Sequence, residues 1–431
     1  MSTSPAPADA LPAPLVVRTV ALDELATGHD PADLLRLLPA HGGLAWVRRG
    51  DGIVGWGEAA RVPVSGPDRF AAADRAWREL LTRAVVRDEV GLPGTGPVAF
   101  GTFAFDDRSP AGGVLVVPSV VVGRRDGHAW MTTIGTGLAA PGPLVTDPEP
   151  VTAPGGVELT DATMSPADWE QVVARGVQAI RAGRLDKVVL ARDVLARTTQ
   201  PLDPRWALHR LADRYDSCWT FAVDGLIGAT PELLLRAERG LVTSRVLAGT
   251  IRRTGDDDAD IARAGILAHS SKDLEEHEYA VRSVAQALAP FCTSANVPDV
   301  PFVLSLPNVL HLASDITGVL AAEHRSSLAL AAALHPTAAV CGTPTDAARD
   351  LIRELEQMDR GRYAGPVGWM GADGDGEWGI GLRSAQLDAD DPHRVRLFAG
   401  CGVLAASSPA AELAESSAKL EPMRYALGAT D

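Results

Sequence analysis

The chain is organised around Arg394-Val-Arg-Leu-Phe-Ala-Gly-Cys-Gly-Val-Leu404, which is followed closely by Ser408-Pro-Ala-Ala-Glu-Leu-Ala-Glu-Ser-Ser-Ala-Lys419. The first segment is typical of a β-strand that ends in small residues. The second is typical of a helix with Ser408 at its N-cap and Pro409 at its first position. A strand therefore runs into a helix through a glycine-rich turn, where backbone can approach a ligand closely.

The expected helix carries charged side chains on one face. Glu412, Glu415 and Lys419 are spaced i, i+3 and i+7, so they project from the same side. Two carboxylates and an ammonium could hold a divalent cation and an anion together there. The same spacing is also typical of a solvated helix face with weak ion pairs, so this helix alone leaves both interpretations open.

The composition is that of a soluble globular protein: 431 residues, 46% hydrophobic and 22% charged. A net charge of −15 argues against a nucleic-acid or anionic-membrane partner, because both need a basic surface. No apolar run of about 18 residues could span a bilayer, and Met1-Ser-Thr-Ser-Pro-Ala-Pro-Ala8 lacks the blocks of a signal peptide, so we expect a cytoplasmic protein. Neither a zinc site nor a disulfide framework is expected from the widely spaced Cys218, Cys292, Cys341 and Cys401.

Strands and helices are expected in runs rather than in regular βαβ alternation, which favours an α+β fold with antiparallel sheets. Residues 1–14 are rich in Ala and Pro and are expected to be disordered. A connection rich in Pro and Gly is expected over Gly135–Gly156. Tight hairpin turns are expected at Glu238–Gly240 and Asp373–Gly376. The expected helices include Arg69–Arg87, Ser165–Gly183, Asp258–Phe291, Arg325–Leu334 and Thr345–Gln357.

A second acidic pair, Asp273 and Glu276, is again spaced i, i+3 on an expected helix. If this helix faced the one that carries Glu412 and Glu415, the four carboxylates would offer hard oxygen ligands. Such ligands suit Mg²⁺ better than zinc. Two unrelated exposed faces would give the same spacing.

Two further side chains have both a structural and a chemical interpretation. Lys187 opens an otherwise apolar strand, where a lysine commonly reaches out to solvent. If it is desolvated, it can act as a general base. Glu232 follows a proline at the start of a strand; it is either a solvated strand end or a partly buried, protonated general acid.

Arg383 lies in Trp378-Gly-Ile-Gly-Leu-Arg383. Alternation along a strand places the two glycines and Arg383 on one face, which leaves room for a ligand carboxylate to reach the guanidinium. His311 and His335 are more often structural histidines than catalysts.

Taken together, these residues resemble the motifs of the chorismate-utilising enzymes, and most closely those of the isochorismate synthases. The matching segments occur in the family's order over roughly residues 160–425. They are Lys187-Val-Val-Leu-Ala-Arg192, Gly228-Ala-Thr-Pro-Glu-Leu-Leu234, Leu247-Ala-Gly-Thr250, Lys272-Asp-Leu-Glu-Glu-His277, His311-Leu312, His335-Pro-Thr-Ala-Ala-Val-Cys-Gly-Thr-Pro344, Arg362-Tyr-Ala-Gly365, Leu382-Arg383 and Ala399-Gly-Cys-Gly402 with Glu412, Glu415 and Lys419.

The resemblance implies one large α+β unit, in which two similar halves bring antiparallel sheets together and helices pack outside. Residues 15–150 would be the N-terminal half of this unit, and residues 160–426 the chorismate-binding catalytic region. The apparent boundary near Gly135 would then be an internal connection.

The resemblance also implies a reaction: Mg²⁺-dependent conversion of chorismate to isochorismate, by water addition at C2 and loss of the C4 hydroxyl. Lys187 would be the base that activates water, and Glu232 the acid that protonates the leaving hydroxyl. The carboxylates that would hold Mg²⁺ are Glu276, Glu415, Asp273 and Glu412, the last two directly or through water. The residues that would bind substrate are Gly249, Thr250, His311, Tyr363, Arg383, Gly402 and Lys419.

Within the family, a lysine at position 187 favours water over ammonia as the nucleophile, so no glutaminase subunit is expected. Ala248 stands where covalent-intermediate aminodeoxychorismate synthases carry a lysine. The alternatives are a salicylate synthase, which also eliminates pyruvate, and a non-catalytic metal- or anion-binding protein on the same scaffold. A monomer is expected, and whether the product feeds menaquinone or a siderophore is left open.

Overall fold

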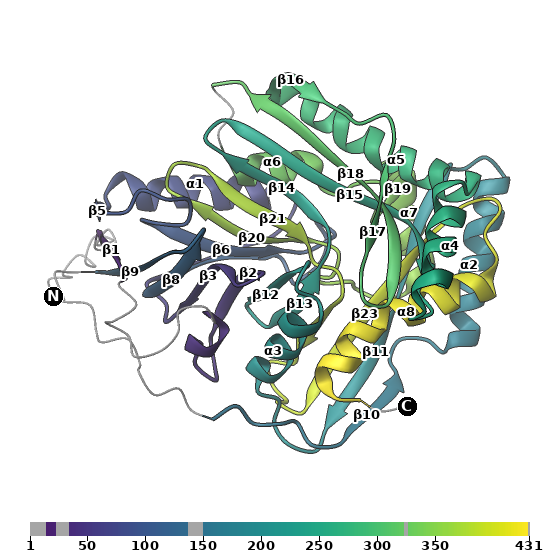
Figure 1. Cartoon of the computed structure of the whole chain (residues 1–431), viewed down its shortest axis with the longest axis horizontal. Coiled ribbons are helices and arrows are strands. Elements are labelled where there is room, and N and C mark those ends of the chain that lie inside the picture. The colour runs from purple at the N-terminus through teal and green to yellow at the C-terminus, as the bar shows by residue number, and fades with distance from the viewer. Residues whose placement is uncertain (1–13, 23–33, 137–149, 323–325, 430–431) are drawn as a thin grey trace, which may run out of the picture.

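The computed structural model describes residues 14–22, 34–136, 150–322 and 326–429. Nearly all of the predicted disordered tail, and most of the predicted connection over Gly135–Gly156, lie outside these residues. Within them the secondary structure forms two large β-sheets with helices packed on the outside (Figure 1). The predicted α+β class with antiparallel sheets is confirmed.

The larger sheet has 13 strands among the described residues. Every pairing in it is antiparallel except that of β1 with β5. β19 (Gly342–Thr343) pairs with β11 beside the main path of the sheet. In spatial order the other strands are β10 (Val157–Asp161), β11 (Lys187–Thr198), β23 (Arg394–Val403), β22 (Ser384–Leu387), β13 (Leu226–Thr230), β12 (Trp219–Val223), β2 (Leu44–Arg48), β3 (Asp51–Trp56), β8 (Val120–Arg125), β9 (His128–Thr136), β1 (Leu15–Ala21) and β5 (Val85–Asp88).

The smaller sheet has 10 strands in the same described part of the chain, all in antiparallel pairs. β17 (Phe302–Ser305) pairs with β18 beside the main path. The spatial order of the rest is β16 (Cys292–Asn296), β18 (Val309–Leu320), β15 (Leu241–Arg252), β14 (Leu233–Glu238), β21 (Gly376–Ile380), β20 (Pro366–Gly371), β6 (Val98–Phe103), β7 (Gly113–Val117) and β4 (Ala60–Val64). Both sheets thus combine early and late parts of the chain.

Helices cover the sheets, and α2, α7 and α8 pack against β11 and β23 at the right of Figure 1. An apolar cluster that includes Trp169 of α2 and Val188 and Leu190 of β11 fills this region. The helices are α1 (Arg69–Thr82), α2 (Pro166–Arg181), α3 (Pro204–Arg214), α4 (Asp257–Ala268), α5 (Ser271–Leu288), α6 (Ser327–Leu334), α7 (Thr345–Glu356) and α8 (Pro409–Leu427), with short 3₁₀ turns at Leu34–Leu37 and Ala289–Phe291.

Two predicted helices end elsewhere than expected. The long helical region predicted over Asp258–Phe291 is divided into α4 and α5, because the Ser270 hydroxyl accepts from the Asp273 backbone N–H and caps a new helix. The helix predicted to run to Arg87 stops at Thr82 and is followed by β5.

Two predicted helix starts and two predicted hairpin turns are confirmed. The Ser165 hydroxyl caps α2, and α8 follows Ser408 with Pro409 at its first position. The Ser408 side chain itself makes no capping hydrogen bond. Both predicted hairpin turns join adjacent antiparallel strands, β14 to β15 and β20 to β21.

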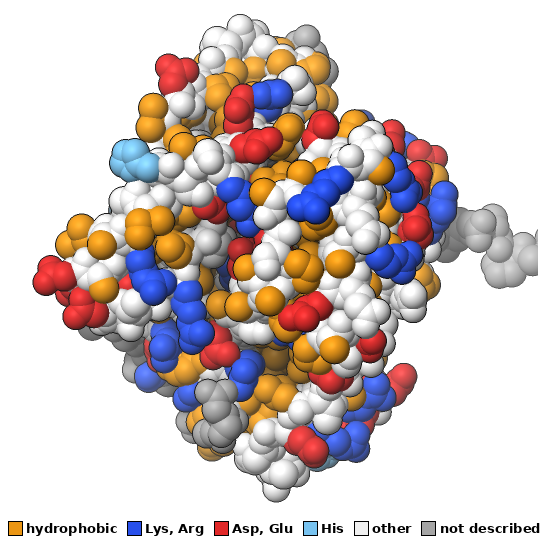
Figure 2. Space-filling model, turned by 90° about the vertical axis from the view of Figure 1, so that its right-hand side faces the viewer, with side chains coloured by type: hydrophobic (Ala, Val, Ile, Leu, Met, Phe, Trp, Pro, Cys, Tyr) orange, Lys and Arg blue, Asp and Glu red, His pale blue; other side chains and the backbone are white. Residues whose placement is uncertain are grey.

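Of the described helices, none is long and apolar enough to cross a membrane. On the face shown in Figure 2, acidic and basic side chains are interspersed around a central hollow. The net charge of −15 is therefore not gathered into one acidic patch on this side of the molecule.

Candidate active site

A cavity of about 60 Å³ lies where the two sheets meet, with walls from β11 and β23 of one sheet and β15 and β18 of the other. Most residues predicted to act on a ligand line it: Glu232, Gly249, Thr250, Glu276, His311, Tyr363, Arg383, Gly402 and Lys419. Four predicted residues lie next to this lining rather than in it: Lys187, Asp273, Glu412 and Glu415.

Lys187 does not reach solvent: its side chain is 0% exposed, so the desolvated interpretation holds. Its Nζ lies 3.3 Å from Oε1 of Glu276, which is an ion pair without hydrogen-bond geometry. Among the described residues no hydrogen-bond partner takes the N–H groups of this ammonium. An ammonium has three N–H groups, so one ion pair leaves Nζ able to donate to a ligand as well.

Glu232 is also buried, in the turn between β13 and β14. Burial raises the pKa of its carboxyl to about 8, and the charges of Lys187, Lys419 and Arg383 oppose this rise. The carboxyl is therefore protonated at neutral pH. A buried protonated acid near a buried lysine is the arrangement expected of an acid and base pair.

The four predicted metal ligands lie on α5 and α8, and three of them pair with lysines. Glu412 binds Lys272 at 2.9 Å, Glu415 binds Lys419 at 2.6 Å, and Glu276 pairs with Lys187. In the described part of the chain, no group of three or more His, Cys, Asp or Glu side chains is arranged to hold a metal.

The carboxylates nevertheless affect one another electrostatically. The pKa of Glu415 is raised by burial and by the charges of Glu412 and Glu276, although Lys419 opposes the rise. Asp273 lies behind the cavity wall, since a Cβ on Gly249 would stand 3.0 Å from its Cβ. Burial is the main cause that raises the pKa of Asp273, and the charge of Glu276 adds to this rise. The hydrogen bond with the Ser270 hydroxyl lowers the same pKa and so opposes the rise. These acidic groups thus share one small volume.

A hydrogen-bonded chain holds Arg383 at the cavity. Its Nη2 lies 3.1 Å from Nε2 of His311, whose Nδ1 lies 3.0 Å from the Thr250 hydroxyl. Because a guanidinium only donates, Nε2 accepts and the proton sits on Nδ1. Burial and the charge of Arg383 lower the pKa of His311 well below its usual value, so the ring is neutral. His311 therefore orients Arg383 rather than transferring protons in this state.

Arg383 has no carboxylate within ion-pair distance among the described side chains. Its guanidinium is buried, and that burial lowers its pKa. A buried cation without an anion partner fits a ligand carboxylate. Tyr363, stacked on Phe398 with ring centroids 5.1 Å apart, forms a neighbouring wall.

Two glycines let backbone approach the charged groups. Gly249 has φ +79°, a conformation that side chains rarely adopt. At Gly402 of β23, a Cβ would stand 2.1 Å from Oε1 of Glu276 and 3.2 Å from Cε of Lys187. The absence of a side chain at Gly402 therefore makes room for the Lys187–Glu276 pair.

Sequence reasoning missed Arg360, which lines the cavity and pairs with Glu356. The available signal was their i, i+4 spacing at the end of an expected helix. On a sequence this spacing indicates a solvated helix face, because nothing local shows that both side chains are buried.

Known proteins are similar to this chain over most of its length. The family described as chorismate binding enzyme matches residues 44–137 and 146–428. The isochorismate synthase DhbC of Bacillus subtilis is 41% identical over 274 residues, covering 61% of this chain and 68% of the relative. The salicylate biosynthesis isochorismate synthase of Pseudomonas aeruginosa is 34% identical over 436 residues, covering 93% of this chain and 89% of the relative.

Solved structures show the same fold. The crystal structure of DhbC from Bacillus anthracis superposes with a TM-score of 0.76 at 32% identity. The superposition covers 92% of this chain and 99% of the Bacillus anthracis chain. The menaquinone-specific isochorismate synthase MenF from Escherichia coli gives a TM-score of 0.77 at 25% identity. That superposition covers 96% of this chain and 95% of the MenF chain.

Proposed function

The chain belongs to the chorismate binding enzymes, and from this premise we propose that it is an isochorismate synthase, an isomerase that converts chorismate to isochorismate. One observation carries the proposal: a fully buried lysine, Lys187, and a buried, protonated carboxylic acid, Glu232, interact at one cavity. A binding module would have no use for both groups, since each costs free energy to bury.

Lys187 acts as the general base in this proposal. Its amine takes a proton from a water molecule, whose oxygen forms a bond to C2 of the ring. The Lys187 ammonium pairs with Glu276, which is one of the residues that would hold Mg²⁺.

Glu232 acts as the general acid. As the C2–O bond forms, the ring double bonds shift and the C4–O bond breaks, and the Glu232 proton leaves with the hydroxyl as water. One water enters and one leaves, so the overall change is an isomerisation. In this scheme Arg383 binds a substrate carboxylate. The neutral ring of His311 orients the Arg383 guanidinium through a hydrogen bond.

The donor set also fits Mg²⁺, because Glu276, Glu415, Asp273 and Glu412 offer only carboxylate oxygens. Three of these carboxylates, Glu276, Glu412 and Glu415, each form an ion pair with a lysine. The carboxylates therefore already bind positive charge at this site. Mg²⁺, when bound by these residues, would neutralise a substrate carboxylate that four acidic groups would otherwise repel.

The test is to incubate the purified protein with chorismate and Mg²⁺, with an EDTA control, and to separate the products by chromatography. We expect isochorismate without pyruvate, and no product with EDTA. Salicylate with stoichiometric pyruvate would instead make it a salicylate synthase. Absence of chorismate consumption under all conditions would contradict the proposed function.

Gly402→Ala tests the proposed metal ligands. The new Cβ would clash with the flexible end of Glu276, so the protein is expected to fold while this carboxylate is displaced. The Mg²⁺ concentration for half-maximal activity should rise by about tenfold or more, as for other changes that disturb ligand orientation. Titrating activity against Mg²⁺ measures it.

The matched control is Gly135→Ala on β9, where a Cβ would meet no atom of the described residues within 4 Å. It is expected to leave the Mg²⁺ dependence unchanged. An unaltered Mg²⁺ dependence in Gly402→Ala as well would argue against Glu276 as a ligand.

A further inference from the structure

One edge of β11 lacks a neighbouring strand next to the cavity. On one side, residues 188–197 pair continuously with β23. On the other side, β19 pairs only with Lys187 and Val188, and β10 only from Val194 onward. Among the described strands none pairs with residues 189–193 on this side. Their backbone groups are buried and need partners from elsewhere.

A buried ion pair supplies two of these partners. The Ala191 N–H donates to Oε1 of Glu356 at 2.8 Å, and the Val189 carbonyl accepts from Nη2 of Arg360 at 2.8 Å. The remaining groups of these two residues bond to Cys341 and to the indole of Trp169. Glu356 and Arg360 thus take the place of a strand where β11 has none.

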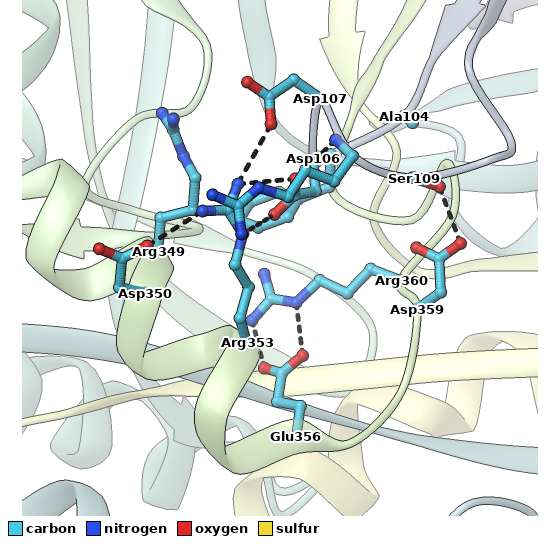
Figure 3. A network of polar contacts seen from close by, with 12 residues as sticks. Ala104, Asp106, Asp107, Ser109, Arg349, Asp350, Arg353, Glu356, Asp359 and Arg360 are labelled. Carbon is cyan, nitrogen blue, oxygen red and sulfur yellow. Dashed lines mark hydrogen bonds and ion pairs between the residues drawn. The ribbon is translucent and has the colours of Figure 1, made fainter. Parts of the chain in front are cut away.

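The two side chains also hold each other. Nε of Arg360 donates to Oε2 of Glu356 at 2.9 Å, and Nη2 donates to Oε1, as Figure 3 shows. Glu356 is 1% exposed and Arg360 3% exposed. Nη1 of Arg360 donates to the Val340 carbonyl, and its guanidinium lies 4.3 Å from the centre of the Phe105 ring. The pair is fixed from several directions.

Stability alone does not account for this pair. A buried ion pair commonly contributes no more to stability than a well-packed apolar pair of similar volume. An apolar pair, however, could neither accept from the Ala191 N–H nor donate to the Val189 carbonyl. The hydrogen bonds to the strand are what the charged residues add.

We propose that Glu356 and Arg360 are positioning residues for the reaction, which fix β11 and hence Lys187 relative to Glu232. Lys187 lies two residues before Val189 on the same strand. The Arg360 carbonyl also accepts from the Tyr363 N–H at 3.0 Å, in the backbone turn that leads to this cavity residue. This inference rests on the proposed function.

The test uses the double variant Glu356→Gln/Arg360→Gln, because it leaves no buried charge without a partner and is therefore expected to fold. Amide ends make weaker hydrogen bonds to β11 than charged groups do. We expect kcat to fall by about 100-fold, the effect of misplacing a reacting group by about 1 Å, while KM stays near the wild-type value. The single variants should lose more, since each leaves one buried charge unpaired.

The matched control is Arg353→Gln on the same helix. Arg353 binds Asp106, Asp107 and Asp350 and is partly exposed, but it makes no hydrogen bond to β11 (Figure 3). This variant should lower the melting temperature and leave kcat unchanged. Loss of kcat in both variants to the same extent would overturn the inference in favour of general destabilisation.

A second measurement does not depend on activity. Amide hydrogen exchange over residues 187–193 should be faster in the double variant and unchanged in Arg353→Gln. An inactive wild type would contradict the proposed function, whereas an active wild type with unchanged kcat in the double variant would contradict only the positioning role. Unchanged exchange would overturn the structural basis of the inference.

Discussion

Replacing Lys187 with alanine is expected to lower kcat by about 10²- to 10⁴-fold, the usual contribution of a general base. Its Nζ is buried and has Glu276 as its ion-pair partner, so no solvent base can take over at the same point. The binding of chorismate, followed by ligand-induced fluorescence change, should weaken much less than kcat falls. Steady-state kinetics at saturating chorismate and Mg²⁺ measure the change.

A small primary amine provides the control for this variant. Removing the side chain leaves space for ethylamine, which can accept a proton but cannot restore the packing of the strand. Partial recovery of turnover with added amine, rising with pH, is expected of a missing base. Turnover equal to that of the wild type without any amine would show that Lys187 is not the base.

Glu232→Gln is expected to have the second-largest effect, again about 10²- to 10⁴-fold on kcat, because glutamine cannot donate the proton that the leaving hydroxyl needs. The pKa of this carboxyl is raised to about 8 by burial. Wild-type kcat should therefore fall as pH rises above about 8, because the acid is then deprotonated. The variant should lack this alkaline decline, which a pH–rate profile from pH 6 to 9 measures.

The same residue gives a prediction for stability with a definite sign. The pKa of the Glu232 carboxyl is 4.5 when it is exposed in the unfolded chain and about 8 in the folded protein. Between these two pH values the folded state therefore holds a proton that the unfolded state releases. The free energy of unfolding should therefore decrease as pH rises from about 4.5 to about 8. Glu232→Gln should lose less stability across this range than the wild type. An equal loss in both proteins would contradict the assigned pKa.

Much of the local structure could be predicted from the sequence, because its signals are local. The Asp373–Gly376 turn and the Ser165 cap each depend on a few adjacent residues. The break before α5 was equally local, since Ser270 and Asp273 have the spacing of a helix start. It was missed because apolar residues continue at helical spacing on both sides of it.

The pairing of charges at the site could not be predicted from spacing. Lys272 and Glu412 lie on different helices and are brought together only by the tertiary fold. Most of the residues that the resemblance named line one cavity, but it did not indicate that lysines would pair with three of the carboxylates. The roles of these residues, and the division into an N-terminal half and a catalytic region, stay predictions.

The pairing of β11 with β23 has a consequence for how the protein is made. Val188 is paired with Val403, so the strand that carries the proposed base gains this partner only after most of the chain has been synthesised. Contacts between such distant residues give a high contact order, which slows folding because the intervening loop must first be closed. Until then β11 presents an unpaired apolar strand, a kind of segment that aggregates at micromolar concentration. Soluble expression should therefore depend on chaperone supply and on slow translation at low temperature.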